Sequence, residues 1–207
     1  MVNGLAASRF NPRHWARQVL LLATLALSGC ATHYVDSNTK EVPVADYKKP
    51  VNAKPVQLLF EFQTRGAINT RATDFLKAQV SDQVKTSGLF SAVDDKPVAG
   101  GALLSVTLNN VPLTDDLFTK GFVTGLTFGL AGSTVSDGYV CTVKYVDAGH
   151  ADPIVKMARH AIHTTMGASG APPNAIKADS VTAAINVMTR QIVSQVLNDL
   201  AQDPAFP

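Results

Sequence analysis

The sequence predicts an α+β fold, in which a mixed, largely antiparallel sheet carries two amphipathic helices packed on one face. Short alternating apolar runs, bounded by Gly, Pro, Asn and Asp, are typical of strands. Two longer stretches, 71–87 and 181–201, instead repeat apolar residues every three or four positions, as amphipathic helices do. The order strand, helix, strand, strand, hairpin, helix therefore indicates helices layered against one sheet.

The first strand and the first helix are expected at 56–62 and 71–87. The segment 56–62 is short and rich in aromatic and aliphatic residues, which favours a strand. Asn69 or Thr70 can cap the helix that follows. Gly88 stands where a helix ends in a left-handed residue. Two further strands are expected at 89–93 and 102–108.

A hairpin and a long helix complete the predicted domain. Alternating residues at 139–146 and 154–165 flank a turn rich in Asp and Gly, which indicates two paired strands. The closing helix begins after Asp179 or Ser180, either of which can cap it. Its apolar stripe consists of Val181, Ala184, Ile185, Met188, Ile192, Val196 and Leu200.

The first 30 residues have the pattern of an export signal. Basic residues come first and no acidic residue accompanies them; they are Arg9, Arg13 and Arg17. The apolar run at 19–27 is too short to span a bilayer, which takes about 20 residues. It ends in Leu27, Ser28, Gly29 and Cys30.

This ending resembles the lipobox of bacterial lipoprotein signal sequences. The resemblance implies that a signal peptidase recognises Leu27, Ser28 and Gly29 and cleaves before Cys30. It also implies a diacylglycerol group on the Cys30 thiol and a further acyl chain, such as palmitate, on the new amine. Ala31 resembles the pattern sorted to the outer membrane, because Asp at that position favours inner-membrane retention in enteric-type bacteria. The alternative is an ordinary secretory signal with an accidental cysteine.

The predicted organisation has three parts. Residues 1–29 form the signal peptide and residues 55–207 a single periplasmic domain. Residues 30–54, polar and interrupted by prolines, are expected to form a flexible tether. Cleavage removes three of the 18 lysines and arginines, which leaves 15 basic residues against 16 acidic ones. A nearly neutral chain gives no support for a nucleic-acid partner, which would require a basic patch.

The two cysteines are not expected to form a disulfide. Cys30 would carry lipid, so Cys141 would have no partner for a bond. Cys141 lies within an alternating run, and we expect it to be buried as a small apolar residue.

An unusual glycine-rich apolar segment occupies residues 117–135. Its glycines follow a spacing of four and then three: Gly121, Gly125, Gly129 and Gly132. On a helix this spacing makes a groove free of side chains, and the segment resembles a glycine zipper. Three interpretations stay open, namely a surface segment or loop of the domain, a contact with the membrane or a sister subunit, and a complete transmembrane helix.

The domain as a whole resembles small periplasmic domains of envelope proteins. The features that carry the resemblance are the strand at 56–62, the helix at 71–87, the turn Gly88-Leu89-Phe90 and the closing helix. They are similar to the N-terminal domain of TolB and to the periplasmic domain of the curli secretion channel, over residues 55–202. The resemblance implies a fold and does not by itself define a function.

Signatures of catalysis and of metal binding are weak. The segment 167–170 lacks the spacing of a nucleophile elbow, and the glycine-rich segment lacks the lysine of a phosphate loop. His160 and His163 would point to opposite sides of a strand, so we expect partly exposed residues and no metal site. No catalytic residue and no cofactor is predicted, apart from the lipid on Cys30.

The favoured hypothesis is therefore a non-enzymatic, lipid-anchored envelope lipoprotein that acts as an accessory or assembly component of an outer-membrane complex. Its expected partners are the membrane and copies of itself or other envelope proteins, with no nucleic acid. The alternative is a periplasmic carrier of a small ligand or lipid, an auxiliary subunit of an ABC-type transport system, with a pocket between the sheet and the last helix. A lipid-anchored hydrolase would need a Ser or Asp cluster converging with a histidine in a deep pocket.

Overall fold

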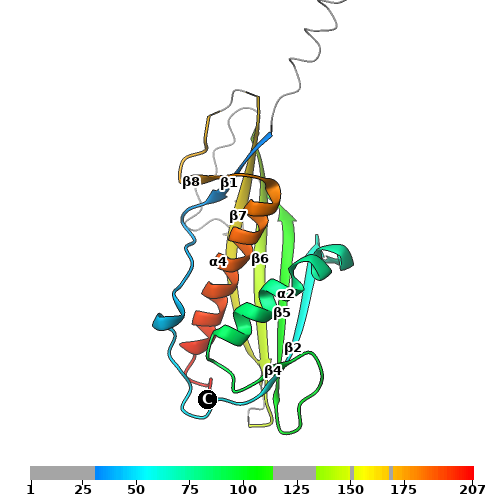
Figure 1. Ribbon diagram of the computed structural model, residues 1–207, viewed down its shortest axis with the longest axis vertical. Helices are drawn as coiled ribbons and strands as arrows, with labels where there is room; N and C mark the ends of the chain where they lie inside the picture. Colours follow the sequence, from blue (N-terminus) through cyan, green and yellow to red (C-terminus); the bar gives the residue numbers. More distant parts are fainter. Residues whose placement is uncertain (1–30, 114–133, 150–151, 168–169) are drawn as a thin grey trace, which may run out of the picture.

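The computed structural model describes residues 31–113, 134–149, 152–167 and 170–207 (Figure 1). Two helices and one short 3-10 turn are seen in this part of the chain: α2 (Thr70–Thr86), α4 (Val181–Ala201) and η1 (Val44–Asp46). The strands are β1 (Ala31–Asp36), β2 (Val56–Thr64), β3 (Ala67–Ile68), β4 (Val93–Asp94), β5 (Ala102–Pro112), β6 (Thr134–Val146), β7 (Ile154–Met166) and β8 (Ala175–Ala178).

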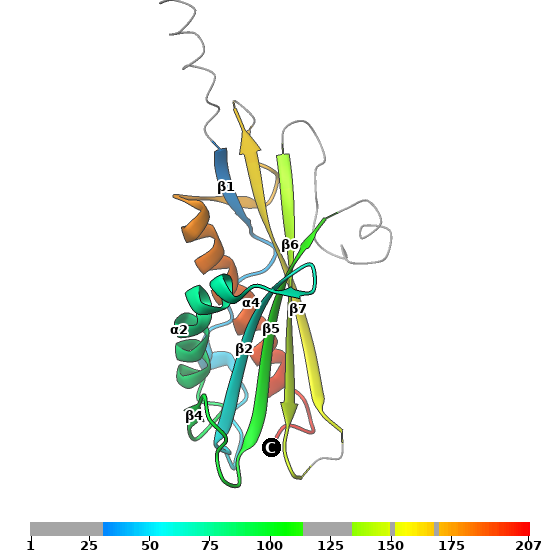
Figure 2. The same ribbon diagram turned by 90° about the vertical axis from the view of Figure 1, so that its right-hand side faces the viewer.

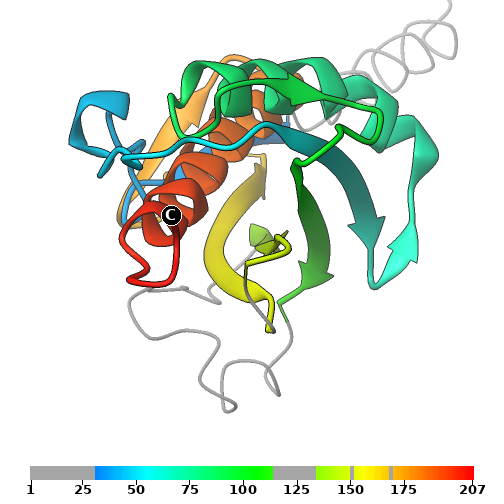
Figure 3. The same ribbon diagram turned by 90° about the horizontal axis from the view of Figure 1, so that it is seen from below.

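All the strands belong to one mixed sheet. Its order is β3-β2-β5-β6-β7-β1-β8, and β4 pairs with β2 off this path. Strands β2 and β5 run parallel because α2 lies in the connection between them, whereas every step from β5 to β8 is antiparallel. Both helices cover the same face of the curved sheet (Figures 2 and 3). The predicted α+β fold is confirmed.

The helix ends follow the expected capping chemistry. The Asn69 side chain accepts a hydrogen bond from Ala72 N at the start of α2, and Ser180 accepts one from Ala183 N at the start of α4. Gly88 follows α2 with a φ of 69°, a left-handed conformation that suits glycine. Local sequence therefore sets these boundaries.

The hydrophobic core lies between the sheet and the two helices. Alternate side chains of β5 and β6, including Val106 and Val143, face the buried stripes of the helices, including Val80 and Ile192. Cys141 belongs to this layer and is fully buried, as predicted, and burial raises the pKa of its thiol to about 12.

The predicted flexible tether is wrong. Residues 31–36 form β1, which pairs with β7 on one side and with β8 on the other. Further along, Tyr47 is only 5% exposed, and its hydroxyl donates a hydrogen bond to Ser194 O at 3.0 Å. The segment lacks a regular pattern because β1 is covered on both faces near its end: Tyr34, Val35 and Asp36 are all buried.

Two smaller differences concern short strands. Of the strand expected at 89–93, only Val93 lies in a strand, β4, because Leu89 and Phe90 are buried in the core instead. The sequence pattern does not predict the edge strand β8. It follows Asn174, a non-glycine residue with a φ of 56°, and has only four residues.

Candidate functional site

The predicted lipidation and self-association residues lie outside the described part of the chain. They are Leu27, Ser28, Gly29 and Cys30, and Gly121, Gly125, Gly129 and Gly132. The described residues that border them nevertheless lie together. They define one end of the sheet, which we call the anchor end, formed by the tips of β1, β6 and β7.

Strand register brings the borders of both predicted segments close to one another. Ala31, which directly follows Cys30, lies opposite Met166 at the end of β7. Thr134, which directly follows the glycine-rich segment, lies opposite Thr165 on the other side of the same strand. Since neighbouring strands lie about 4.8 Å apart, the two borders are separated by about 10 Å. Figure 1 shows β1 beginning at this upper end of the molecule.

Exposed apolar side chains occur at the anchor end. Val135 and Met166 are each 54% exposed, although both belong to long, regular strands. Val135 lies opposite Thr164 of β7, and Met166 follows Thr164 by two residues, so both side chains are on the same face of the sheet as Ile162, which is the helix side. The anchor end therefore offers apolar contact surface beside the residue predicted to carry lipid.

A buried polar cluster lies below the anchor end, on the sheet face turned away from the helices. The Ser136 hydroxyl and His163 Nδ1 are 2.7 Å apart, across the β6–β7 pair. His163 Nε2 lies 3.6 Å from Asp36 Oδ2 in β1. The other carboxylate oxygen of Asp36 accepts a hydrogen bond from Asn38 N at 2.8 Å. His163 is only 2% exposed, so the expectation that it is partly exposed is wrong.

The cluster contains the three residue types of a hydrolytic triad, namely Ser136, His163 and Asp36. Two features of a triad can be compared with it: the distance between base and carboxylate, and the position of the serine in the fold. In such a triad the carboxylate orients the base through a hydrogen bond, whose N···O distance is about 2.7–3.2 Å. The 3.6 Å separation here is longer. Ser136 also lies within the regular strand β6, whereas a nucleophile elbow is a sharp turn between a strand and a helix. Within this group, the Ser136 hydroxyl and His163 Nδ1 form the hydrogen bond that links β6 to β7.

His160 lies on the opposite face from His163, as the strand period predicts. It is fully buried against α4, where its Nε2 is 2.7 Å from Gln191 Oε1. Its Nδ1 accepts a hydrogen bond from Ala161 N, so Nε2 carries the proton and donates to the glutamine. Burial lowers the pKa of His160. The expected partial exposure of this residue is therefore also wrong.

The space between the sheet and α4 is mostly filled by side chains. A cavity of about 200 Å³ lies beside β8 and the first half of α4, lined by Val35, Asp36, Ile176, Lys177, Val187 and Gln191. Ligand pockets typically measure about 300–1,000 Å³. Within the described ranges, no three His, Cys, Asp or Glu side chains are grouped to hold a metal ion, and no helix is long and apolar enough to cross a membrane.

Comparison with known proteins gives distant structural matches. No family model and no curated protein sequence matches the chain. A PelC variant from Paraburkholderia phytofirmans, described as a dodecamer, matches with a TM-score of 0.36 at 12% identity, over 85% of this chain and 98% of that one. A minor lipoprotein from Acinetobacter baumannii matches with a TM-score of 0.30 at 15% identity, over 74% of this chain and 88% of the other. Similarity at this level carries no argument about what this chain does.

Proposed function

We propose that this protein is a non-enzymatic lipoprotein of the cell envelope, held on the periplasmic face of the outer membrane by lipid on Cys30. It serves there as an accessory or assembly component of an outer-membrane complex. The observation that carries the proposal is the lipobox sequence placed directly before β1. The lipid-bearing residue is then covalently joined to the first residue of the sheet.

This placement supports a defined orientation of the domain on the membrane. With no spacer between lipid and sheet, the anchor end lies against the bilayer and the long strands extend away from it. Strand β7 has 13 residues, so the opposite end of the sheet stands about 40 Å away at about 3.3 Å per residue. The exposed Val135 and Met166 side chains then face the lipid headgroup region.

The glycine-rich segment forms part of the same proposal. It leaves β5 after Pro112 and enters β6 at Thr134, so both of its ends join strands that reach toward the anchor end. We propose that Gly121, Gly125, Gly129 and Gly132 contact the membrane or a neighbouring copy close to the lipid. Small residues at this spacing permit close backbone approach.

Cell fractionation of a Cys30→Ser variant tests the anchor. The variant is expected to leave the membrane fraction or to accumulate with its leader peptide uncut, because the thiol that accepts lipid is gone. Cys141→Ser is the matched control: it makes the same chemical change at a buried position and leaves the chain in the membrane fraction. Cys30→Ser protein of mature size that still fractionates with the outer membrane would overturn the proposal.

A further inference from the structure

The outer edge of β2 is open along its middle. Strand β4 pairs with the start of β2 and β3 pairs with its end. At that end, Phe62 N donates to Thr73 Oγ1 and Phe62 O accepts from Asn69 N, so the backbone groups of Phe62 point outward. Strand alternation gives Leu58 and Phe60 the same outward direction. In the described part of the chain, no strand pairs with these two residues on that side.

The open edge of β2 borders a groove. A cavity of about 310 Å³ runs along it, lined by Leu58 and Phe60 on one side and by Lys77, Ser81 and Val93 on the other. An adjoining hollow continues onto the outer face of the sheet beside Leu59 and Glu61. The edge is therefore accessible to another extended segment, and an open strand edge is a template for pairing.

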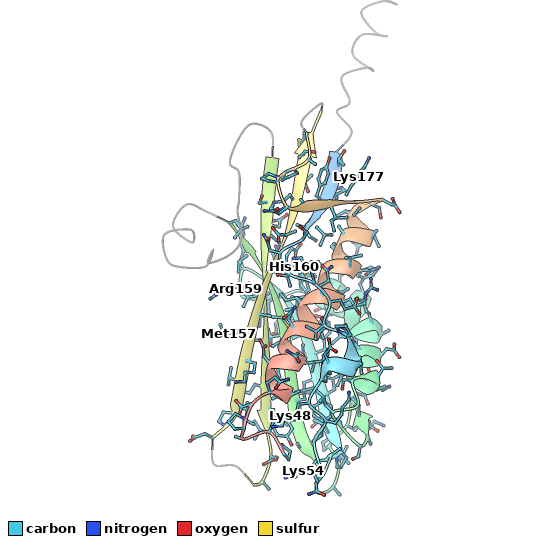
Figure 4. All side chains as sticks on the ribbon, turned by 90° about the vertical axis from the view of Figure 1, so that its left-hand side faces the viewer. Lys48, Lys54, Met157, Arg159, His160 and Lys177 are labelled. Atoms are coloured by element: carbon cyan, nitrogen blue, oxygen red, sulfur yellow. The ribbon has the colours of Figure 1, made fainter. Side chains whose placement is uncertain are left out.

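At the opposite edge of the sheet lies β8, and no described strand pairs with its outer side. Ser37 N donates to Asn174 O, which places the backbone groups of Asn174 toward β1. By alternation, Ala175 and Lys177 present their N–H and C=O groups to the open side. Both Ile176 and Lys177 have exposed side chains, and Figure 4 shows Lys177 at the edge near the anchor end.

We propose that β2 of one copy pairs in parallel with β8 of a second copy, so that the sheet continues from one molecule into the next. In a parallel pair, a residue whose N–H and C=O groups point to the partner strand lies opposite a residue whose N–H and C=O groups point away from it. Phe60 then faces Ile176, and Glu61 faces Lys177. The apolar pair lies on the helix side of both copies, and the oppositely charged pair lies on the outer face.

An antiparallel arrangement fits the side chains less well. It would set Phe60, on the helix side, opposite Ala175 or Lys177, on the outer face. The second copy would then be turned over relative to the first. Parallel pairing avoids this mismatch. It also agrees with the strand directions within one copy: β2 is parallel to β5, and four antiparallel steps from β5 to β8 leave β8 parallel to β2.

The parallel arrangement also keeps every anchor end pointing in the same direction. This step rests on the proposed function, since copies that each carry lipid at Cys30 must face one membrane. The contact joins two different surfaces of the chain, so it is heterologous and repeats from copy to copy, closing into a ring where the rotation allows.

Disulfide trapping in the full chain tests the pairing. The double variant Glu61→Cys with Lys177→Cys places two thiols at neighbouring backbone positions of different copies, about 5 Å apart, which suits a disulfide. Within one copy the two positions are five strand spacings apart, about 24 Å, so no internal bond can form. Mild oxidation is expected to give a ladder of covalent multimers.

The matched control pairs Glu61→Cys with Lys144→Cys, an exposed position on the same outer face but inside the sheet. It is expected to give at least tenfold less multimer. Equal yields from the two double variants would overturn the pairing. Mass spectrometry of Cys30 in the same samples separates the two proposals: an unmodified Cys30 with a cross-linked ladder refutes the anchor alone, and an acylated Cys30 without a ladder refutes the pairing alone.

A charge exchange provides a second measurement. Glu61→Lys or Lys177→Glu alone sets like charges opposite each other and is expected to weaken self-association about fivefold. The double exchange restores opposite charges and is expected to recover association to within about twofold. Light scattering of detergent-solubilised protein measures both. If the double variant is as weak as the two single changes combined, Glu61 and Lys177 do not face each other.

Discussion

Val35→Ala distinguishes a structural strand from a tether at residues 31–36. Val35 is 4% exposed and pairs with Ile162, itself 3% exposed, in the core layer facing α4. The substitution removes two carbons from this layer. At about 0.8 kcal/mol for each, the lost transfer free energy is about 1.6 kcal/mol, and the cavity left behind raises the total to about 2–3 kcal/mol. The free energy of unfolding should fall by that amount.

The control for this experiment is Val51→Ala, the same chemical change in the same stretch that the sequence predicts as a tether. Val51 is 94% exposed, so its loss should alter the free energy of unfolding by less than about 0.5 kcal/mol. Urea unfolding of both variants gives the difference, provided that the m-value is unchanged. If Val35→Ala and Val51→Ala unfold at the same urea concentration, β1 does not contribute to the folded domain.

Two further predictions concern buried titratable groups. The folded protein should show no thiol reactive toward a maleimide at pH 8, because Cys141 is fully buried with a pKa raised to about 12 and Cys30 is proposed to carry lipid. One thiol should appear on denaturation, and a reactive thiol in the folded protein would mean that Cys30 is free. Burial lowers the pKa of His160 in the folded protein, so the unfolded chain takes up a proton first as the pH falls below about 6.5. The contribution of neutral His160 to the free energy of unfolding is therefore fully present above this pH. Below it, the free energy of unfolding declines by at most about 1.4 kcal/mol per pH unit. Urea unfolding at pH 8 and pH 5 should show a smaller pH effect in His160→Gln, and an identical effect in both proteins would contradict this assignment.

The features that could be predicted are those recorded in local sequence. The stripe of α4 extends over 21 residues, and the turn between β6 and β7 is marked by Asp and Gly. The caps Asn69 and Ser180 act within three residues of their own position, so no distant partner has to be known. Helix periodicity and capping are therefore visible before any tertiary contact is considered.

The features that could not be predicted depend on distant partners. Strand β1 has six residues, too few to show a period, and its pairing partner β7 lies more than 100 residues further along the chain. His160 and His163 look like exposed strand residues because their partners are not neighbours in sequence. Gln191 is 31 residues from His160, and Ser136 is 27 residues from His163. Burial of a polar residue follows from such long-range contacts.

The incorporation of residues 31–54 into the domain limits where a partner can bind. A flexible tether of 25 residues could extend up to about 80 Å and would let the domain search a wide volume. Instead, Val42 N donates to Ser194 Oγ at 2.9 Å, and Gln195 Nε2 donates to Lys40 O at 2.7 Å, which fixes the segment along α4. With the proposed lipid on Cys30, a domain of this kind would reach only its own length, about 40 Å, from the bilayer. Under the proposed anchoring, a partner would have to come to the domain at the membrane surface, and copies that meet there would share one orientation.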